Sequence, residues 1–399
     1  MTHSIKLKFL LPLFALALGW GPSAFAVDLL ELPAVQTSTA TRALLLDVTP
    51  RGEGAFVTVG EYGVILVSED GGESWTQAQV PASVTLTGVY FPTAQHGWAV
   101  GHDGLILYSE DGGHSWTKQL DGHQLNEQIL PVAERIVEKF RAEVEALQLA
   151  AESDENFDEY ALEDAEFMLE EAEFMLEGAM DDVDAGPVRP LLDVWFRDES
   201  EGFVAGAYGM LLHTNDGGAT WELVSDRIRN AQAFHLNQIM AGPYGTLYIA
   251  GESGYVYRSL DGGASWDSLQ PGYEGSFYGM VIVPGEGEEY ELLAYGLRGN
   301  LFSSMDRGES WSERDSGTTV TLITGLALPD GSVVLAGQAG LILRRAAGQD
   351  AFVAARNPDR RVISGIAQQT DGHLLLVGLG GVRVAQPDGS PVESETESP

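Results

Sequence analysis

The sequence of 399 residues has no cysteine, only four lysines, and no long apolar run beyond its first residues. Without cysteine the protein can form no disulfide, thiolate zinc site, cysteine nucleophile or cysteine-linked lipid anchor. Beyond the N-terminal region, no stretch approaches the roughly 18 successive apolar residues that mark a membrane-spanning helix. We therefore expect no transmembrane segment in the mature protein.

The N-terminal residues have the features of a secretory signal. Two lysines precede an apolar run over residues 9–18, and the sequence Ala-Phe-Ala at 24–26 offers the small residues that a signal peptidase prefers. Residues 1–26 are therefore predicted to be a signal peptide. We expect an exported protein, located in the periplasm of a Gram-negative cell, or in the thylakoid lumen or periplasm if the host is photosynthetic.

Positive charge is scarce. The chain has 22 Lys and Arg against 59 Asp and Glu, a net charge of −37, and nucleic acid is not an expected partner because phosphate binding needs a basic surface. The acidic residues are concentrated, since residues 121–186 contain 21 acidic and three basic side chains, a net charge of −18. This segment is predicted to form a separate structural unit, which we place at residues 123–187.

One octet recurs five times in the rest of the chain. The copies are SEDGGESW (68–75), SEDGGHSW (109–116), TNDGGATW (214–221), SLDGGASW (259–266) and SMDRGESW (304–311). A short Asp side chain accepts hydrogen bonds from nearby backbone amides and so closes a turn, and the Trp begins a strand and buries a large apolar area. We predict structural roles for Asp70, Asp111, Asp216, Asp261, Asp306, Trp75, Trp116, Trp221, Trp266 and Trp311.

A Gly-x-x-Gly signature sets the period of the repeat. Its seven copies begin at Gly60, Gly101, Gly206, Gly251, Gly296, Gly337 and Gly378. All gaps are 41 or 45 residues except one of 105, which holds the acidic segment. Such a period, with alternating apolar residues between Gly-rich turns, predicts an all-β, seven-bladed propeller with four-stranded blades and an inserted α-helical hairpin. Both glycines of the signature are expected at turn positions with positive φ.

The period assigns the domain boundaries. Residues 27–122 should form blades 1 and 2, residues 188–386 blades 3 to 7, and the Ser/Glu/Pro-rich residues 387–399 a disordered tail. The seventh copy has no Trp strand after it, whereas an apolar stretch precedes the first blade. We therefore predict that residues 27–40 supply the outer strand of the last blade, closing the ring and removing its open edge.

The acidic segment has helical spacing of apolar residues over 125–150 and 158–180. Two amphipathic helices joined by a short loop would form a hairpin. The duplicated AEFMLE sequence gives it the apolar residues Phe167, Met168, Phe174 and Met175. These side chains either pack between the helices and on the ring, or form an adaptable surface that binds a partner.

Arginines gather in segments expected on one face of the ring. In a four-stranded blade, the turn between the second and third strands opens on the same face as the connection to the next blade. The arginines predicted there are Arg227, Arg229, Arg298, Arg356, Arg360 and Arg361. They either bind a partner or pair locally with the abundant carboxylates.

The octet matches Ser/Thr-x-Asp-x-Gly-x-x-Trp, the Asp-box or bacterial neuraminidase repeat. Joined to the preceding Gly-x-x-Gly over about residues 41–385, it resembles the photosystem II stability and assembly factor family of seven-bladed propellers. That resemblance implies a role in assembly of a membrane-protein complex and an arginine-lined face that holds a membrane-protein precursor. Relatives of the family also occur in non-photosynthetic bacteria, where the client would be an envelope complex such as a transporter. The helical insertion departs from the family pattern.

Asp-boxes also occur in sialidases, so a carbohydrate-active propeller, sialidase-like or another glycosidase, is the alternative. The Phe/Tyr-Arg-Ile-Pro segment usual in sialidases is missing, and the histidines are scattered without metal-ligand spacing. We therefore predict a non-catalytic, monomeric scaffold without cofactor or metal, whose partner is a membrane-associated protein or complex.

Overall fold

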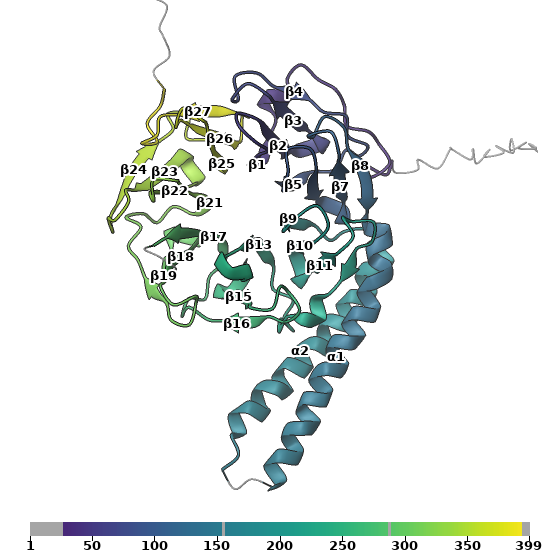
Figure 1. Ribbon diagram of the computed structural model, residues 1–399. Coiled ribbons are helices and arrows are strands. Elements are labelled where there is room, and N and C mark those ends of the chain that lie inside the picture. The colour runs from purple at the N-terminus through teal and green to yellow at the C-terminus, as the bar shows by residue number, and fades with distance from the viewer. Residues whose placement is uncertain (1–26, 154–155, 286–288, 393–399) are drawn as a thin grey trace, which may run out of the picture.

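The computed structural model describes residues 27–153, 156–285 and 289–392. In this part of the chain seven antiparallel sheets are arranged around a central axis, and a pair of helices projects from the ring (Figure 1). The prediction of an all-β, seven-bladed propeller with a helical hairpin is thus confirmed. The predicted signal peptide, residues 1–26, lies outside the described residues. Within the described residues, no helix combines the length and hydropathy needed to cross a bilayer.

Each sheet is formed by strands that follow one another in the chain. The first three blades are β1 Leu45–Pro50, β2 Phe56–Gly60, β3 Ile65–Ser68 and β4 Thr76–Gln77; β5 Leu86–Tyr90, β6 Gly97–Gly101, β7 Ile106–Ser109 and β8 Thr117–Leu120; β9 Leu191–Phe196, β10 Gly202–Gly206, β11 Leu211–Thr214 and β12 Glu222–Leu223. Blades 4 and 5 are β13 Leu236–Ala241, β14 Leu247–Gly251, β15 Val256–Ser259 and β16 Asp267–Leu269; β17 Phe277–Pro284, β18 Tyr290–Gly296, β19 Leu301–Ser304 and β20 Ser312–Glu313. Blades 6 and 7 are β21 Leu322–Ala327, β22 Val333–Gly337, β23 Leu341–Arg345 and β24 Phe352–Arg356; β25 Ile363–Gln368, β26 Leu374–Gly378 and β27 Arg383–Ala385.

The core lies between neighbouring blades. The second strand of a blade is covered on both sides by adjacent blades, so every residue of β2, β6, β10, β14, β22 and β26 is buried. Because both faces of these strands are buried, their sequences are largely continuous apolar runs and do not alternate between apolar and polar residues. The outer strands are short, with only two residues in β4, β12 and β20.

The prediction that residues 27–40 close the ring as a strand is wrong. The last sheet has three strands, and residues 27–40 contain none. This segment packs instead along the connection between blades 1 and 2, where the Ala34 amide donates to the Val80 carbonyl at 3.0 Å and the Ser83 amide to the Leu29 carbonyl at 2.9 Å. Leu30 is buried in the core shared by these blades.

The ring closes by packing of side chains between blades 7 and 1. Leu45 and Phe56 of blade 1 share a buried cluster with Leu375 and Val377 of blade 7. After Gln386 the chain turns back, and Ala385 of β27 forms a β-bridge with Pro391. The residues that follow β27 therefore cover part of its edge. The first residues of the predicted disordered tail therefore fold back on the last blade, and residues 393–399 lie outside the described part.

The Gly-x-x-Gly signature forms a short 3₁₀ turn between the second and third strands of the first six blades. These turns are Glu61–Gly63, His102–Gly104, Ala207–Gly209, Glu252–Gly254, Leu297–Gly299 and Gln338–Gly340; the remaining short helices are Ala40–Arg42, Ser225–Arg227 and Pro243–Gly245. The expectation of positive φ holds only for the second glycine. Gly60 is extended (φ −172°), and glycine is needed there because a Cβ would lie 2.1 Å from the carbonyl oxygen of Leu44. Gly63 has φ +71°.

The octets form the turns between the third and fourth strands. In the first copy the Asp70 carboxylate accepts from the Ser68 hydroxyl and the Ser74 amide, each at 2.9 Å. The indole of Trp75 donates to the Gly72 carbonyl at 3.0 Å. The other four copies repeat the two carboxylate bonds with their own residues. The Ser74 and Ser265 hydroxyls, which donate to Asp70 and Asp261, and the amides of the same serines lower the pKa of these two carboxyl groups to about 2.

The inserted hairpin consists of α1 (Gly122–Ser153) and α2 (Glu159–Ala185). Its base is part of the ring, because Leu125, Ile129 and Ile136 of α1 share a buried cluster with Met210 and Leu223 of blade 3. Farther along, the two helices extend outward past the rim (Figure 1). The hairpin is therefore not a lid over the ring.

Candidate functional site

One face of the ring carries the 3₁₀ turns and the connections between blades, as the antiparallel strand order requires. We call it the connection face. Its turns and connections are hydrogen-bonded together, for example from the Glu61 amide to the Leu44 carbonyl and from the His102 amide to the Thr85 carbonyl. The opposite face carries the octet turns. All six arginines predicted from the sequence lie in segments of the connection face.

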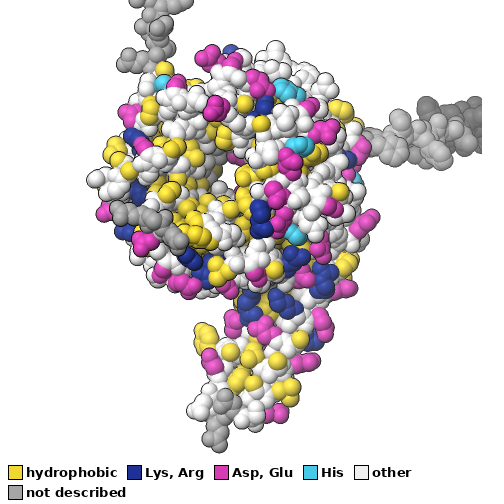
Figure 2. All heavy atoms as spheres, in the orientation of Figure 1, with side chains coloured by type: hydrophobic (Ala, Val, Ile, Leu, Met, Phe, Trp, Pro, Cys, Tyr) yellow, Lys and Arg dark blue, Asp and Glu magenta, His cyan; other side chains and the backbone are white. Residues whose placement is uncertain are grey.

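Two of these arginines are engaged within the protein. Arg229 forms ion pairs of 2.7 Å with Glu143 of α1 and with Asp164 of α2, and its guanidinium lies 5.2 Å from the ring centre of Phe140. Arg227 lies 3.5 Å from Glu222. The local-pairing alternative thus describes both arginines, and Arg229 in addition fixes the hairpin to the ring. Figure 2 shows basic side chains gathered where the hairpin joins the ring.

The other four arginines are exposed and lie on successive blades. Arg298 lies in the turn of blade 5 with φ 58°, in the left-handed region. Arg356 donates to the Ala339 carbonyl at 3.5 Å, and Arg360 borders Gly340 of the same turn. Arg361 borders Gly380 of blade 7 and lies 3.9 Å from Asp359. We call Arg298, Arg356, Arg360 and Arg361 the arginine arc.

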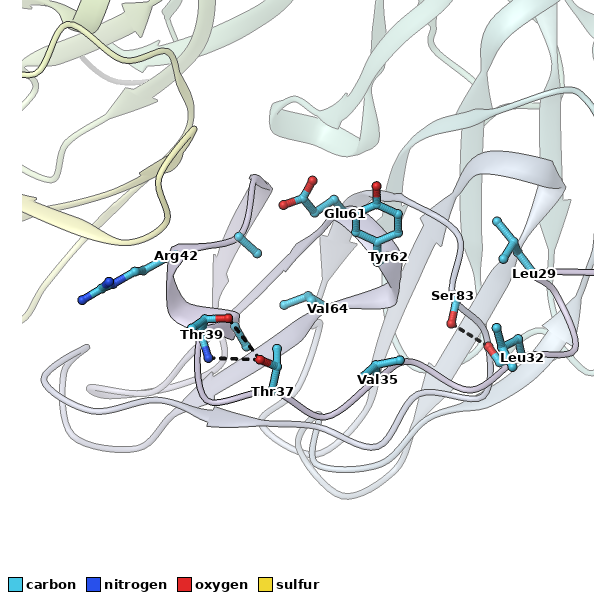
Figure 3. Close-up of a pocket in the computed structure, with 12 residues that line it drawn as sticks. Leu29, Leu32, Val35, Thr37, Thr39, Arg42, Glu61, Tyr62, Val64 and Ser83 are labelled. Atoms are coloured by element: carbon cyan, nitrogen blue, oxygen red, sulfur yellow. Dashed lines mark hydrogen bonds between the residues drawn. The ribbon is translucent and has the colours of Figure 1, made fainter.

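An apolar groove of about 490 Å³ lies beside the first turn of the connection face (Figure 3). No pattern in the sequence indicates this groove, because it forms between the N-terminal segment and blade 1. Leu32 and Val35 line it from one side and Tyr62 and Val64 from the other. Exposed Arg42, which no described residue pairs with, also lines the groove and adds a cation on blade 1, next to blade 7.

The apolar residues of α2 divide between two faces of the helix. Met168 and Met175 pack in the cluster that joins the hairpin to blades 2 and 3. Phe167 and Phe174 point away from it and are 49% and 75% exposed. Tyr160, one heptad earlier and 79% exposed, extends the same stripe. The four predicted residues therefore do not form one surface, and an aromatic stripe of Tyr160, Phe167 and Phe174 remains exposed.

The central channel contains a polar site that was not predicted from the sequence. Asp47 of β1 and Asp193 of β9 each follow a β-bulge in an innermost strand and line one cavity of about 340 Å³. Burial raises the pKa of both carboxyl groups, and the charge of Asp47 adds to the rise for Asp193, whose pKa is about 7. In the described part of the chain, no three His, Asp or Glu side chains cluster as metal ligands.

Seven radial sheets, five of which have a Ser/Thr-x-Asp turn between their third and fourth strands, define a β-propeller. The sequence model of one propeller family, described as photosynthesis system II assembly factor YCF48, matches residues 73–136 and 179–382. The chain belongs to this family. The interval between the matched segments, residues 137–178, is the outer part of the hairpin, which the family model does not match.

Solved structures show the same fold. A structure described as "YCF48 bound to D1 peptide" is 16% identical with a TM-score of 0.56, covering 88% of this chain and 97% of that one. YCF48 from Cyanidioschyzon merolae is 14% identical with a TM-score of 0.54, covering 86% and 94%. The WD40 propeller domain of Doa1 is 11% identical with a TM-score of 0.57, covering 90% and 97%. Among curated protein sequences, no significant match is found.

Proposed function

We propose that this protein is a non-catalytic, exported scaffold that binds a membrane-associated protein and assists the assembly or stability of its complex. The observation that carries the proposal is membership of the assembly-factor family in a chain whose arginine arc lies exposed on one face. The complex would be photosystem II in a photosynthetic host, and otherwise an envelope complex such as a transporter. Its place of action would be the periplasm or the thylakoid lumen.

The charge distribution supports this use of the connection face. In a chain of net charge −37, four exposed arginines on adjacent blades form a local positive surface that favours a carboxylate-rich or C-terminal segment of a client. The similarity to a propeller solved with a bound D1 peptide agrees with peptide binding by this fold. A rigid ring also presents several such loops at fixed distances.

The repeated carboxylates favour a non-catalytic role. Each octet Asp accepts hydrogen bonds from its own turn, and their pKa values are lowered, so they remain charged turn formers at neutral pH. They also lie far apart on the ring, one in each of five blades. The octet carboxylates therefore lack the arrangement that general acid catalysis of glycoside cleavage needs, two carboxyl groups at one cleft with a raised pKa on one of them. The channel pair of Asp47 and Asp193 approaches that arrangement, so a glycan-hydrolysis assay of the natural protein and of Asp193→Asn tests the alternative of a carbohydrate-active propeller.

The test is affinity capture of membrane proteins from detergent-solubilised host membranes with purified protein. We expect one membrane complex to be retained by the natural chain and lost when Arg298, Arg356, Arg360 and Arg361 are replaced by Ser. Arg307→Gly, which removes a cation from the opposite face at a residue of φ 64°, is the control and should retain it. Equal retention by both variants would contradict the proposed binding face.

A further inference from the structure

The central channel holds two carboxylates that have no basic partner among the described residues, and we propose that it binds a small organic cation bearing N–H donors. The chemical class is a primary ammonium or guanidinium group. Asp47 and Asp193 would accept its hydrogen bonds, and Tyr295 would add a third contact. This site is separate from the arginine arc and does not rest on the proposed partner.

The cavity is enclosed by the ring itself. All seven innermost strands contribute to its wall, with Thr87, Asn237, Gln238, Tyr278, Thr324 and Ser364 among the polar residues. The volume of about 340 Å³ suits a small organic molecule or the end of a side chain. Because the wall comes from every blade, the site requires no segment to move into place.

The cavity has no positively charged side chain in its described lining. No Lys, Arg or His is among its lining residues, and no cation contributes to the pKa of Asp47 or Asp193. Elsewhere in the described chain, a buried guanidinium such as that of Arg345 is matched to a carboxylate, Glu291. Two carboxylates that repel each other inside a ring would gain from a cation placed between them.

Tyr295 provides the second observation. Its side chain is 1% exposed, lines the cavity, and makes no hydrogen bond within the described residues. Its hydroxyl lies beside Gly279, where a Cβ would be 2.4 Å away and would block it. The side chain is held in place by its burial while its hydroxyl has no partner among the described residues, so the hydroxyl is free to bond to a ligand in the cavity.

The oxygen atoms available in the cavity favour a cation with N–H groups over a metal ion. Each carboxylate already accepts backbone amides, from Val48 and Val89 for Asp47 and from Val194 and Ile239 for Asp193. Each still has lone pairs that can accept a further N–H. A divalent metal takes six or more oxygen ligands, and the described residues contain no group of three His, Asp or Glu side chains that could hold one.

Titration calorimetry of the whole protein with cadaverine and with agmatine tests the proposal. One of these amines should bind with a stoichiometry near one, and Asp193→Asn should weaken it at least about tenfold. Asp350→Asn makes the same charge change on an exposed residue and should have no effect. Tyr295→Phe preserves the packing of the ring and should weaken binding by about threefold to tenfold, which keeps the test valid if Asp193→Asn does not fold.

Several results would overturn the proposal. It would be overturned if neither amine binds saturably, or if Asp193→Asn and Asp350→Asn weaken binding equally. Unchanged binding of the amine to Tyr295→Phe would overturn it as well. Calcium or magnesium binding that depends on Asp193 and excludes the amine would also overturn it, because it would assign the site to a metal.

Discussion

The carboxylate of Asp47 in blade 1 accepts a 2.9 Å hydrogen bond from the backbone amide of Val89 in blade 2. The same kind of hydrogen bond links blades 3 and 4 and blades 4 and 5. The Ile239 amide donates to the Asp193 carboxylate at 2.9 Å, and the Met280 amide donates to the Gln238 side-chain oxygen at 2.6 Å. In each case the polar residue follows a bulge of an innermost strand. Side chains in the channel therefore bond neighbouring blades directly.

Replacing Asp47 should weaken this link between blades. Asp47→Ala leaves the amides of Val48 and Val89 without their acceptor, and the free energy of unfolding should fall by about 1–3 kcal/mol. Asp47→Asn keeps one acceptor oxygen and should cost less. Urea denaturation of the two variants measures the difference, and an equal loss in both would refute the role of the hydrogen bonds.

The pH dependence of stability should show a contribution from Asp193. Its pKa is raised from 3.8 to about 7 in the folded protein, so between these values the folded state holds a proton that the unfolded state has lost. This group therefore contributes a free energy of unfolding that falls as pH rises from about 4 to 7. Asp47 and Tyr295 are the titratable groups that act on it.

Comparing the natural protein with Asp193→Asn isolates that contribution. Relative to the variant, the natural protein should be more stable at pH 5 than at pH 8, by about 1–3 kcal/mol. The octet carboxylates have the opposite sign, because the pKa of Asp70 is lowered to about 2 and its contribution is lost only as pH falls from about 4 to 2. Parallel stability curves for the two proteins between pH 5 and 8 would exclude the assigned shift.

Two glycine substitutions should change stability in opposite directions. Gly60→Ala would place a Cβ 2.1 Å from the carbonyl oxygen of Leu44, which is backbone and cannot rotate away, so the unfolding free energy should fall by about 1–3 kcal/mol. Gly178→Ala lies within α2 with nothing within 4 Å of the new Cβ, and should stabilise by about 0.5–1 kcal/mol. Thermal denaturation measures both; destabilisation by Gly178→Ala would contradict the helical packing described here.

Arg229 should hold the two helices of the hairpin together. Arg229→Met removes ion pairs to α1 and α2, so amide hydrogen exchange near Glu143 and Asp164 should become faster, with local opening easier by about 1 kcal/mol. Exchange in the ring should not change. Arg197→Met breaks a surface pair with Glu201 in another turn and is the control; if both variants leave the hairpin's exchange unchanged, Arg229 has no such role.

The ring was predictable because its determinants are local and repeated. A turn residue such as Asp70 bonds within four residues of itself, so the octet specifies its own structure wherever it occurs. The apolar runs between these turns then define the strands. The role of the first glycine was not predictable, since its crowding depends on a carbonyl that a different strand brings close.

Features that depend on contacts between distant segments were predicted wrongly or missed. The path of residues 27–40 depends on hydrogen bonds to the connection after blade 1, and no periodicity encodes these. For Arg229 the sequence left partner binding and local pairing open, and the choice depends on carboxylates that α1 and α2 bring close. Asp47 and Asp193 had a signal, because Leu-Leu-Asp-Val occurs at 45–48 and again at 191–194, with a carboxylate inside an otherwise apolar strand.

Site-specific photo-cross-linking tests the proposed binding face most directly. A photoreactive amino acid would be placed at position 298 on the connection face, or at position 307 on the opposite face, in the full chain expressed in its host. We predict a covalent adduct with one membrane protein from position 298 and none from position 307. The account would be contradicted if only position 307 gave an adduct with a membrane protein. It would also be contradicted if position 298 gave no adduct while position 307 reacted equally with many proteins.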